Sequence, residues 1–80
     1  MPVYPEIARR LKIEGSVTVN ALIDESGNVI DTEIIKGIKN DSGTHRSAEE
    51  AVRKWRFNPA IVNGVPVKVW MPVALVFKVE

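Results

Sequence analysis

The sequence predicts an α+β fold, in which an antiparallel three-stranded sheet, with a short extra strand, carries two helices on one face. Three observations predict it. Apolar residues alternate along 16–23 and along the last residues, 65–80, as in strands with one buried face. Two other stretches, 5–12 and 47–57, carry apolar residues at helical spacing. Eighty residues with 45 % hydrophobic side chains suit one small domain, 1–80, with a single core.

The N-terminal helix is predicted to begin near Pro5 and to run for about two turns. A proline suits the first turn of a helix, because an N–H there would have no partner within the helix. Apolar side chains fall on one side of this segment, and Gly15 marks the passage into the strand over 16–23. A helix this short depends on tertiary contacts for its stability.

A second strand is predicted after the turn-forming residues 24–28. Its apolar face consists of Ile30, Thr32 and Ile34. Val29 and Ile35 are out of phase with that face. The mismatch predicts a β-bulge or a barely covered reverse side.

The second helix is predicted to follow a loop, residues 37–46, that is rich in turn formers. Ser47 and Glu50 match a capping box, which places the helix start at Ser47. The apolar face of the helix is made by Ala48, Ala51, Val52 and Trp55. The pair Asn58-Pro59 is expected to end it.

The final strand, 65–80, is predicted to lie at an edge of the sheet. A short strand over 60–62 and the hairpin signal at 63–64 lead into it. Pro66 and Pro72 lack an N–H and both occupy even positions, so both gaps face the same side, as at an edge or a bulge. Beyond Pro72, three outward N–H groups are left unpaired, those of Ala74, Val76 and Lys78. Such an edge is either a liability to be guarded or a place where another chain adds a strand.

No pattern in the sequence indicates catalysis. There is no cysteine, so disulfides and thiol chemistry are excluded. His45 is the only histidine, and it lies in a polar loop without the partners of a catalytic triad. Residues 24–31 resemble a calcium loop only superficially, because the spacing and the closing glutamate are missing. We therefore expect a protein that is not an enzyme and that has no metal or cofactor.

Nucleic-acid binding is not expected either, although four basic residues lie near the second helix: Arg46, Arg53, Lys54 and Arg56. Acidic residues at 49 and 50 are interleaved with them, and the net charge of +1 is too small to indicate a polyanion partner. Trp55 is expected in the core. Trp70 falls in the less buried phase of the last strand. Two roles are equally compatible with that position. Trp70 can be a contact residue beside the open edge, or it can pack over the short strand or under the first helix.

Residues spread over nearly the whole chain resemble one known family. In chain order they are Tyr4-Pro5; Ile13-Glu14-Gly15 with Val17 and Val19; Gly27-Asn28-Val29; residues 51–60, AVRKWRFNPA; and Asn63-Gly64. The series in this order is far more specific than any one of its parts. On these residues the chain resembles the C-terminal domain of TonB-family energy transducers.

The resemblance implies a periplasmic binding module. TonB-like proteins are anchored in the inner membrane of Gram-negative bacteria by an N-terminal helix, cross the periplasm with a proline-rich segment and end in such a domain. The domain binds the TonB box of outer-membrane transporters for siderophores, haem, cobalamin or glycans, and the box adds a strand beside the final strand. The ExbB–ExbD complex, which acts through the absent N-terminal part, supplies the proton-motive force for pulling on the transporter plug.

The resemblance also implies which residues contact the partner. It places Tyr4 and Pro5 close to the TonB box, and it places the residues after Pro72 along it: Val73, Ala74, Leu75, Val76, Phe77, Lys78 and Val79. Trp70 is an additional contact candidate. Arg10 and Lys12 are candidates for electrostatic contacts with the acidic plug or its surround. An alternative function is structural, with the open edge pairing with itself in a homodimer.

Overall fold

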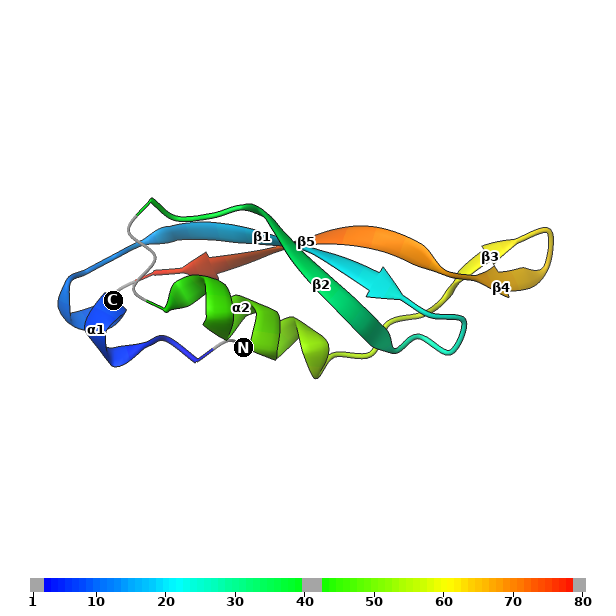
Figure 1. Cartoon of the computed structure of the whole chain (residues 1–80), viewed down its shortest axis with the longest axis horizontal. Helices are drawn as coiled ribbons and strands as arrows, with labels where there is room; N and C mark the ends of the chain where they lie inside the picture. The colour runs from blue at the N-terminus through cyan, green and yellow to red at the C-terminus, as the bar shows by residue number, and fades with distance from the viewer. Residues whose placement is uncertain (1–2, 40–42, 79–80) are drawn as a thin grey trace.

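The computed structural model describes residues 3–39 and 43–78. The molecule is elongated, with extents of 48 × 19 × 18 Å. Its elements, in chain order, are α1 (Glu6–Arg10), β1 (Gly15–Ile23), β2 (Val29–Lys36), α2 (Thr44–Arg53), β3 (Ala60–Val62), β4 (Val65–Val67) and β5 (Val69–Phe77). The hairpin of β3 and β4 projects at one end, and α1 lies at the other (Figure 1).

The main sheet has the strand order β2-β1-β5, and all neighbours are antiparallel. Both helices lie on one side of it, with α2 along the sheet and α1 at one end (Figure 1). The strands β3 and β4 pair with each other in a separate two-stranded sheet. The predicted α+β class with a three-stranded antiparallel sheet is confirmed.

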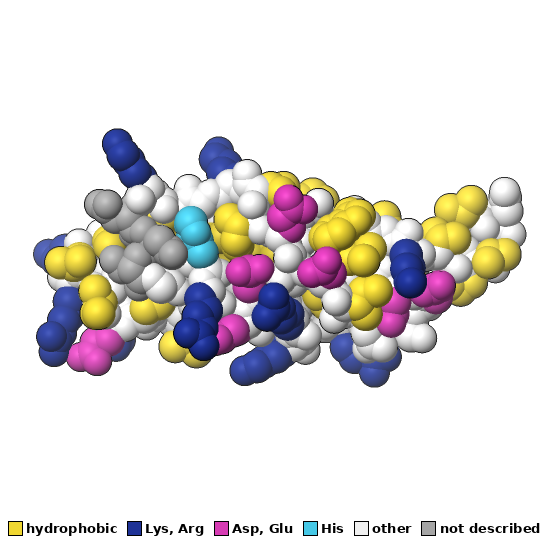
Figure 2. Space-filling model, viewed as in Figure 1, with side chains coloured by type: hydrophobic (Ala, Val, Ile, Leu, Met, Phe, Trp, Pro, Cys, Tyr) yellow, Lys and Arg dark blue, Asp and Glu magenta, His cyan; other side chains and the backbone are white. Residues whose placement is uncertain are grey.

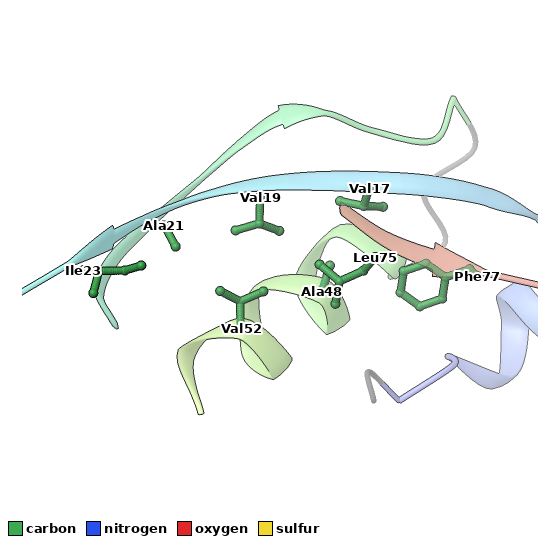
Figure 3. Packing of buried hydrophobic residues seen from close by; sticks show 8 residues of the cluster. All are labelled: Val17, Val19, Ala21, Ile23, Ala48, Val52, Leu75 and Phe77. Carbon is green, nitrogen blue, oxygen red and sulfur yellow. The ribbon is translucent and has the colours of Figure 1, made fainter. Parts of the chain in front are cut away.

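The core lies between β1, β5 and α2, because each of these elements has one apolar face. The buried face of β1 consists of Val17, Val19, Ala21 and Ile23. Ala48 and Val52 of α2, with Leu75 and Phe77 of β5, complete the cluster (Figure 3). Trp55 is half-buried against the same cluster, as predicted. Burial of one large aliphatic or aromatic side chain contributes about 1.5–3 kcal/mol, so this cluster holds helix and sheet together.

Helix α2 begins at Thr44, earlier than the capping-box prediction. Its N-cap is Gly43, with a left-handed φ of 91° and no side-chain cap. Ser47 therefore lies inside the helix, and its N–H donates to the carbonyl oxygen of Gly43 at 3.0 Å. Its hydroxyl donates to the carbonyl of Val3. The predicted capping box of Ser47 and Glu50 is wrong, because the Ser47 hydroxyl ties the N-terminal segment to the helix instead.

Helix α2 also ends earlier than predicted, at Arg53 instead of at 58–59. The N–H of Phe57 donates to the carbonyl oxygen of Gly27 at 2.9 Å, so it is not available to a helical hydrogen bond. The chain after α2 is thus held against the turn between β1 and β2. This tertiary contact ends the helix before the proline is reached.

Strand β2 contains two bulges where its register with β1 shifts. Ile35 and Ile30 are the extra residues, and both side chains are exposed. Val29 packs against the core in place of Ile30. The predicted bulge is confirmed. The predicted face of Ile30, Thr32 and Ile34 is wrong at Ile30, because an extra residue inverts the alternation of side chains.

The predicted strand over 65–80 is divided at Lys68 into β4 and β5. Asn63 and Gly64, with φ values of 50° and 78°, form the predicted hairpin turn between β3 and β4. A two-stranded ribbon twists more strongly than a larger sheet, so the hairpin and the main sheet do not share one straight strand. Strand β5 ends at Phe77, and Val79 lies outside the described residues.

Candidate functional site

The candidate site is the outer side of β5, the side that faces away from β1. β5 pairs with β1 through nine consecutive residue pairs, from Gly15 opposite Phe77 to Ile23 opposite Val69, without a register shift. It forms one edge of the main sheet (Figure 1). Within 3–39 and 43–78, no strand pairs with its outer side. The predicted edge position is confirmed.

Pro72 identifies which backbone groups point outward. It faces Asn20 of β1 in an unshifted register, and it has no N–H to donate, so its nitrogen lies on the outer side. Backbone groups of successive strand residues alternate between the two sides. The outer side therefore carries the N–H and C=O groups of Trp70, Ala74 and Val76 and the carbonyl of Pro72.

Side chains divide the predicted contact residues of β5 into two sets. Leu75 and Phe77 are buried in the core, and Val73 is half-buried against it. Their N–H groups point toward β1 by the same alternation. Ala74 and Val76 have exposed side chains, and Val76 is 67 % exposed. The even-numbered residues of β5 therefore direct their main-chain groups to the open edge, and their side chains lie exposed on the sheet face that α2 does not cover.

The opposite edge of the sheet, formed by β2, is built differently. Two bulges interrupt its pairing. Charged, exposed side chains occur along it, those of Asp31, Glu33 and Lys36. Bulges and charges are features that discourage pairing with another strand. The two edges therefore differ, and only β5 offers a regular, mostly uncharged edge.

Trp70 lies on the sheet face that α2 does not cover. Its side chain is 43 % exposed and its cross-strand neighbour is Leu22 of β1. The cross-strand neighbour of Trp70 therefore lies in neither the short strand nor the first helix, the two packing positions considered from the sequence. The same face carries Thr18 and Asn20, opposite Ala74 and Pro72. These β1 residues were not singled out from the sequence, although their alternation with the buried valines indicates this face.

Tyr4 connects the N-terminal segment to the end of β5. Its ring packs edge-on against Phe77, with centroids 5.4 Å apart, and its hydroxyl donates to the carbonyl of Ile13. Partial burial, and to a lesser degree the negative charge of Glu14, raise the pKa of Tyr4 above its ordinary value. Pro5 is the N-cap residue of α1. The structure therefore places Tyr4 beside Phe77 at the end of β5, whereas Pro5 lies close to Gly43, the N-cap residue of α2.

The two residues predicted to make electrostatic contacts, Arg10 and Lys12, lie at the end of α1 and just after it. Arg10 forms an exposed ion pair with Glu6 at 3.1 Å, of a kind that contributes about 0–1 kcal/mol. Lys12 follows α1 in a left-handed conformation, with φ 54°. Lys78 is exposed just beyond the end of β5.

Basic and acidic side chains are interleaved along α2, as the sequence predicts. Arg46 pairs with Glu50 at 3.0 Å and Arg53 with Glu49 at 3.9 Å. Arg56 donates to the backbone of the turn between β1 and β2. The basic residues near the second helix therefore do not form a continuous positive surface.

Polar residues considered for chemistry have structural partners. His45 accepts a hydrogen bond at Nε2 from the N–H of Ile38, at 3.0 Å. The carboxylate of Asp24 accepts from the N–H groups of Asn28 and Ser26, at 2.9 Å each, and these bonds lower its pKa. Among residues 3–39 and 43–78, no group of three or more His, Cys, Asp or Glu side chains is placed to hold a metal ion. In the same residues, no helix has the length and apolar character for a membrane crossing.

The chain matches the family model described as Gram-negative bacterial TonB protein C-terminal over residues 1–79. Relatives named Protein TonB include one from Vibrio cholerae serotype O1, 39 % identical over 82 residues, covering 99 % of this chain and 32 % of that protein. One from Xanthomonas campestris pv. campestris is 38 % identical over 63 residues, covering 79 % of this chain and 28 % of that protein. One from Pseudomonas aeruginosa is 32 % identical over 79 residues, covering 99 % of this chain and 23 % of that protein. The chain thus spans less than a third of the length of these relatives.

A solved structure of the TonB2 protein from Vibrio anguillarum has the same fold, with a TM-score of 0.74 and 31 % sequence identity. The match covers 100 % of this chain and 76 % of the other. The resemblance inferred from the residues, the family match and the shared fold agree. The chain therefore belongs to the family of TonB C-terminal domains.

Proposed function

We propose that this chain is the transporter-binding domain of a TonB-like energy transducer, and that the TonB box of an outer-membrane transporter joins the outer side of β5 as an added strand. The observation that supports this most directly is the regular nine-residue pairing of β5 with β1, beside an outer side to which no described strand is paired. Membership of the TonB family supports an outer-membrane transporter as the partner. In this role the protein is a binding module, not an enzyme, and it needs no cofactor.

The chain is, in this proposal, one domain of a longer protein. Its relatives are more than three times as long as the part that it matches. An upstream segment would anchor the protein in the inner membrane and contact ExbB–ExbD. Residues 1–80 would form the periplasmic end that reaches the transporter.

The outer side of β5 sets the strength of binding. It offers four carbonyl groups and three N–H groups, since Pro72 contributes no donor. About four to six hydrogen bonds, at roughly 0.5–1.5 kcal/mol net each, are opposed by the cost of ordering a flexible peptide. These bonds total about 2–9 kcal/mol before that cost, so a Kd of about a micromolar, which needs about 8 kcal/mol, requires side-chain contacts as well. Main-chain bonds do not depend on the side chains of the added strand, so one domain can serve transporters with different boxes.

Side chains around the edge add contacts to those of the main chain. Those proposed are Tyr4, Pro5, Trp70, Ala74 and Val76, with Arg10 and Lys12 for acidic groups of the plug. A strand paired along its length shares an axial load among several hydrogen bonds. Such a contact suits a transducer that pulls on a transporter plug for the uptake of siderophores, haem, cobalamin or glycans.

An isotope-labelled sample titrated with a synthetic TonB-box peptide tests this proposal. The largest amide shifts are expected for the outward N–H groups of Trp70, Ala74 and Val76 and for Tyr4 at the end of the edge. A matched peptide with N-methyl groups at alternate backbone nitrogens keeps its side chains but loses its donors, and it should not bind. Shifts concentrated on α2, or equal binding of both peptides, would contradict strand addition.

Self-association through the same edge is the alternative function. The exposed Val76 and the regular register of β5 favour it, because a second copy can pair with this edge as well as a foreign peptide can. Sedimentation across protein concentration would then show a dimer that Val76→Pro removes. A monomer at every concentration would exclude this alternative and leave the transporter-binding proposal untouched.

A further inference from the structure

A groove of about 530 Å³ lies near the α1 end of the molecule, between two segments that are far apart in sequence. One side is formed by residues 11–16, which are the connection after α1 and the first two residues of β1. The other is formed by residues 36–39, which are the last residue of β2 and the three residues after it. We call this feature the lysine groove, because Lys12, Lys36 and Lys39 line it. It lies across β1 from the open edge of β5, since β1 is the central strand of the sheet.

Backbone hydrogen bonds fix the first side of the lysine groove. The N–H groups of Leu11, Lys12 and Ile13 donate to carbonyls of α1, at 3.0, 3.1 and 2.9 Å. Lys12 has a left-handed conformation, with φ 54°, in this turn. Glu14 is the carboxylate on this side, and it lies close enough to Tyr4 to raise the pKa of the tyrosine.

His45 fixes the second side. Its Nε2 accepts the hydrogen bond from the N–H of Ile38 at 3.0 Å. The imidazole fills the space beside Gly37, where a Cβ would lie only 2.1 Å from Nε2. Ile38 in turn lies against Gly15, where a Cβ would be 3.2 Å from its Cγ1. The two sides of the groove are therefore joined to each other and to α2, and the groove exists before any ligand binds.

Positive charge dominates the lysine groove. Lys12, Lys36 and Lys39 make no ion pair with any residue in the described part of the chain. Basic side chains also stand out around this end of the molecule in Figure 2. The screening length is about 8 Å at physiological ionic strength, so a ligand that carries several negative charges and lies in the groove is attracted by the lysines that line it.

We propose that the lysine groove binds an acidic, extended stretch of a partner polypeptide. The lysines come from both sides of a concave groove, which a peptide chain can enter. Lys12 on one side and Lys36 and Lys39 on the other would flank such a chain. The carboxylates of Asp and Glu side chains on such a stretch would pair with the three ammonium groups. The groove lies across β1 from the outer side of β5, so the proposal does not depend on strand addition there, although Lys12 is also a proposed contact for the plug.

An octaglutamate peptide is a suitable probe. Titrated into the labelled domain, it should shift the amides of residues 12–16 and 36–39, and added salt should reverse the shifts. The double variant Lys36→Glu/Lys39→Glu should lower the affinity about tenfold, because two attractions become repulsions. The matched control Lys54→Glu/Lys68→Glu changes the net charge equally at exposed positions elsewhere, and it should lower the affinity less than about twofold. Neither variant alters a buried residue, so both should keep the wild-type circular dichroism spectrum.

Three outcomes would overturn the proposal. Equal weakening by the two double variants would show that the peptide responds only to net charge. Amide shifts spread over lysines throughout the domain would likewise show a response to net charge and not to the groove. Binding of phosphatidylglycerol vesicles, with shifts at residues 12–16 and 36–39 but no response to octaglutamate, would assign the groove to a membrane surface instead. A failure of TonB-box peptides to bind β5 would not affect any of these results.

Discussion

Proline substitutions at two positions of β5 separate its inner and outer sides. At Val76 the N–H points away from β1, so Val76→Pro removes only an outward donor. At Val73, which faces Val19, the N–H points toward β1. Val73→Pro therefore removes a hydrogen bond of the sheet and leaves its acceptor on β1 without a partner.

The structure predicts very different costs for the two changes. A buried carbonyl left without a partner costs about 1–3 kcal/mol, and poorer packing of a half-buried valine adds about 1 kcal/mol. Val73→Pro should thus lower the free energy of unfolding by about 2–4 kcal/mol. That is a large part of the roughly 4–12 kcal/mol expected for a domain of this size. The side chain of Val76 is 67 % exposed, so Val76→Pro should change stability by less than about 1 kcal/mol.

Urea unfolding followed by circular dichroism measures the stability of both variants, and fluorescence anisotropy of a labelled TonB-box peptide measures binding. Val76→Pro should fold normally and bind the peptide about tenfold more weakly or worse, since a donor is lost and the ring obstructs the incoming strand. Val76→Thr keeps the N–H and the branched shape, so its affinity should stay within about twofold of the wild type. Equal destabilisation by the two prolines would refute the assignment of sides. A Val76→Pro domain that binds like the wild type would refute strand addition.

Three further predictions concern the fold that holds the edge in place. Val52→Ala should lower the free energy of unfolding by about 2 kcal/mol, because Val52 is fully buried, whereas Val65→Ala, at a 59 % exposed site, should cost less than about 0.5 kcal/mol in the same urea titration. Gly27→Ala should cost more than about 1 kcal/mol, since φ is +87° and the new Cβ would lie 1.9 Å from the carbonyl oxygen of Phe57; thermal unfolding tests this. Asp24 has a lowered pKa in the folded state, so its contribution is present above its unfolded pKa of about 3.9 and is lost as the pH falls through the folded value. Stability measured from pH 5 to pH 2 should therefore fall less steeply for Asp24→Asn than for the wild type.

Where local pattern and tertiary burial agree, the sequence predicts the structure well. Alternating residues in β1 face a helix, so the predicted face of Val17 to Ile23 is the buried one. Pro72 also identifies the free side of β5 from the sequence, because a proline without an N–H has to point its nitrogen away from the neighbouring strand. Both inferences follow from the chemistry of single residues.

Other features depend on contacts that a local pattern does not contain. The start of α2 at Thr44 follows from the tertiary contact of Ser47, whose hydroxyl donates to the carbonyl of Val3, more than forty residues away. The division at Lys68 leaves the apolar alternation intact on both sides, so the pattern gave no sign of it. The bulge at Ile30 was indicated, but its position depends on pairing with β1.

The candidate site divides in the same way. The edge and its outward groups follow from the sequence of β5, whereas the burial of Leu75 and Phe77 shows that half of the predicted stretch cannot present its side chains. The lysine groove is formed by residues 11–16 and 36–39, which only the fold brings together. No spacing of lysines in the chain indicates it.

Amide hydrogen exchange of β5, with and without a TonB-box peptide, tests the central proposal most directly. In the free monomer, the N–H groups of Ala74 and Val76 should exchange rapidly, while those of Val73 and Leu75 are protected by β1. Saturating peptide should slow exchange at Ala74 and Val76 and leave the other two unchanged. Protection of Ala74 and Val76 in the free monomer, or rapid exchange at both in the complex, would contradict a vacant edge that receives the partner strand.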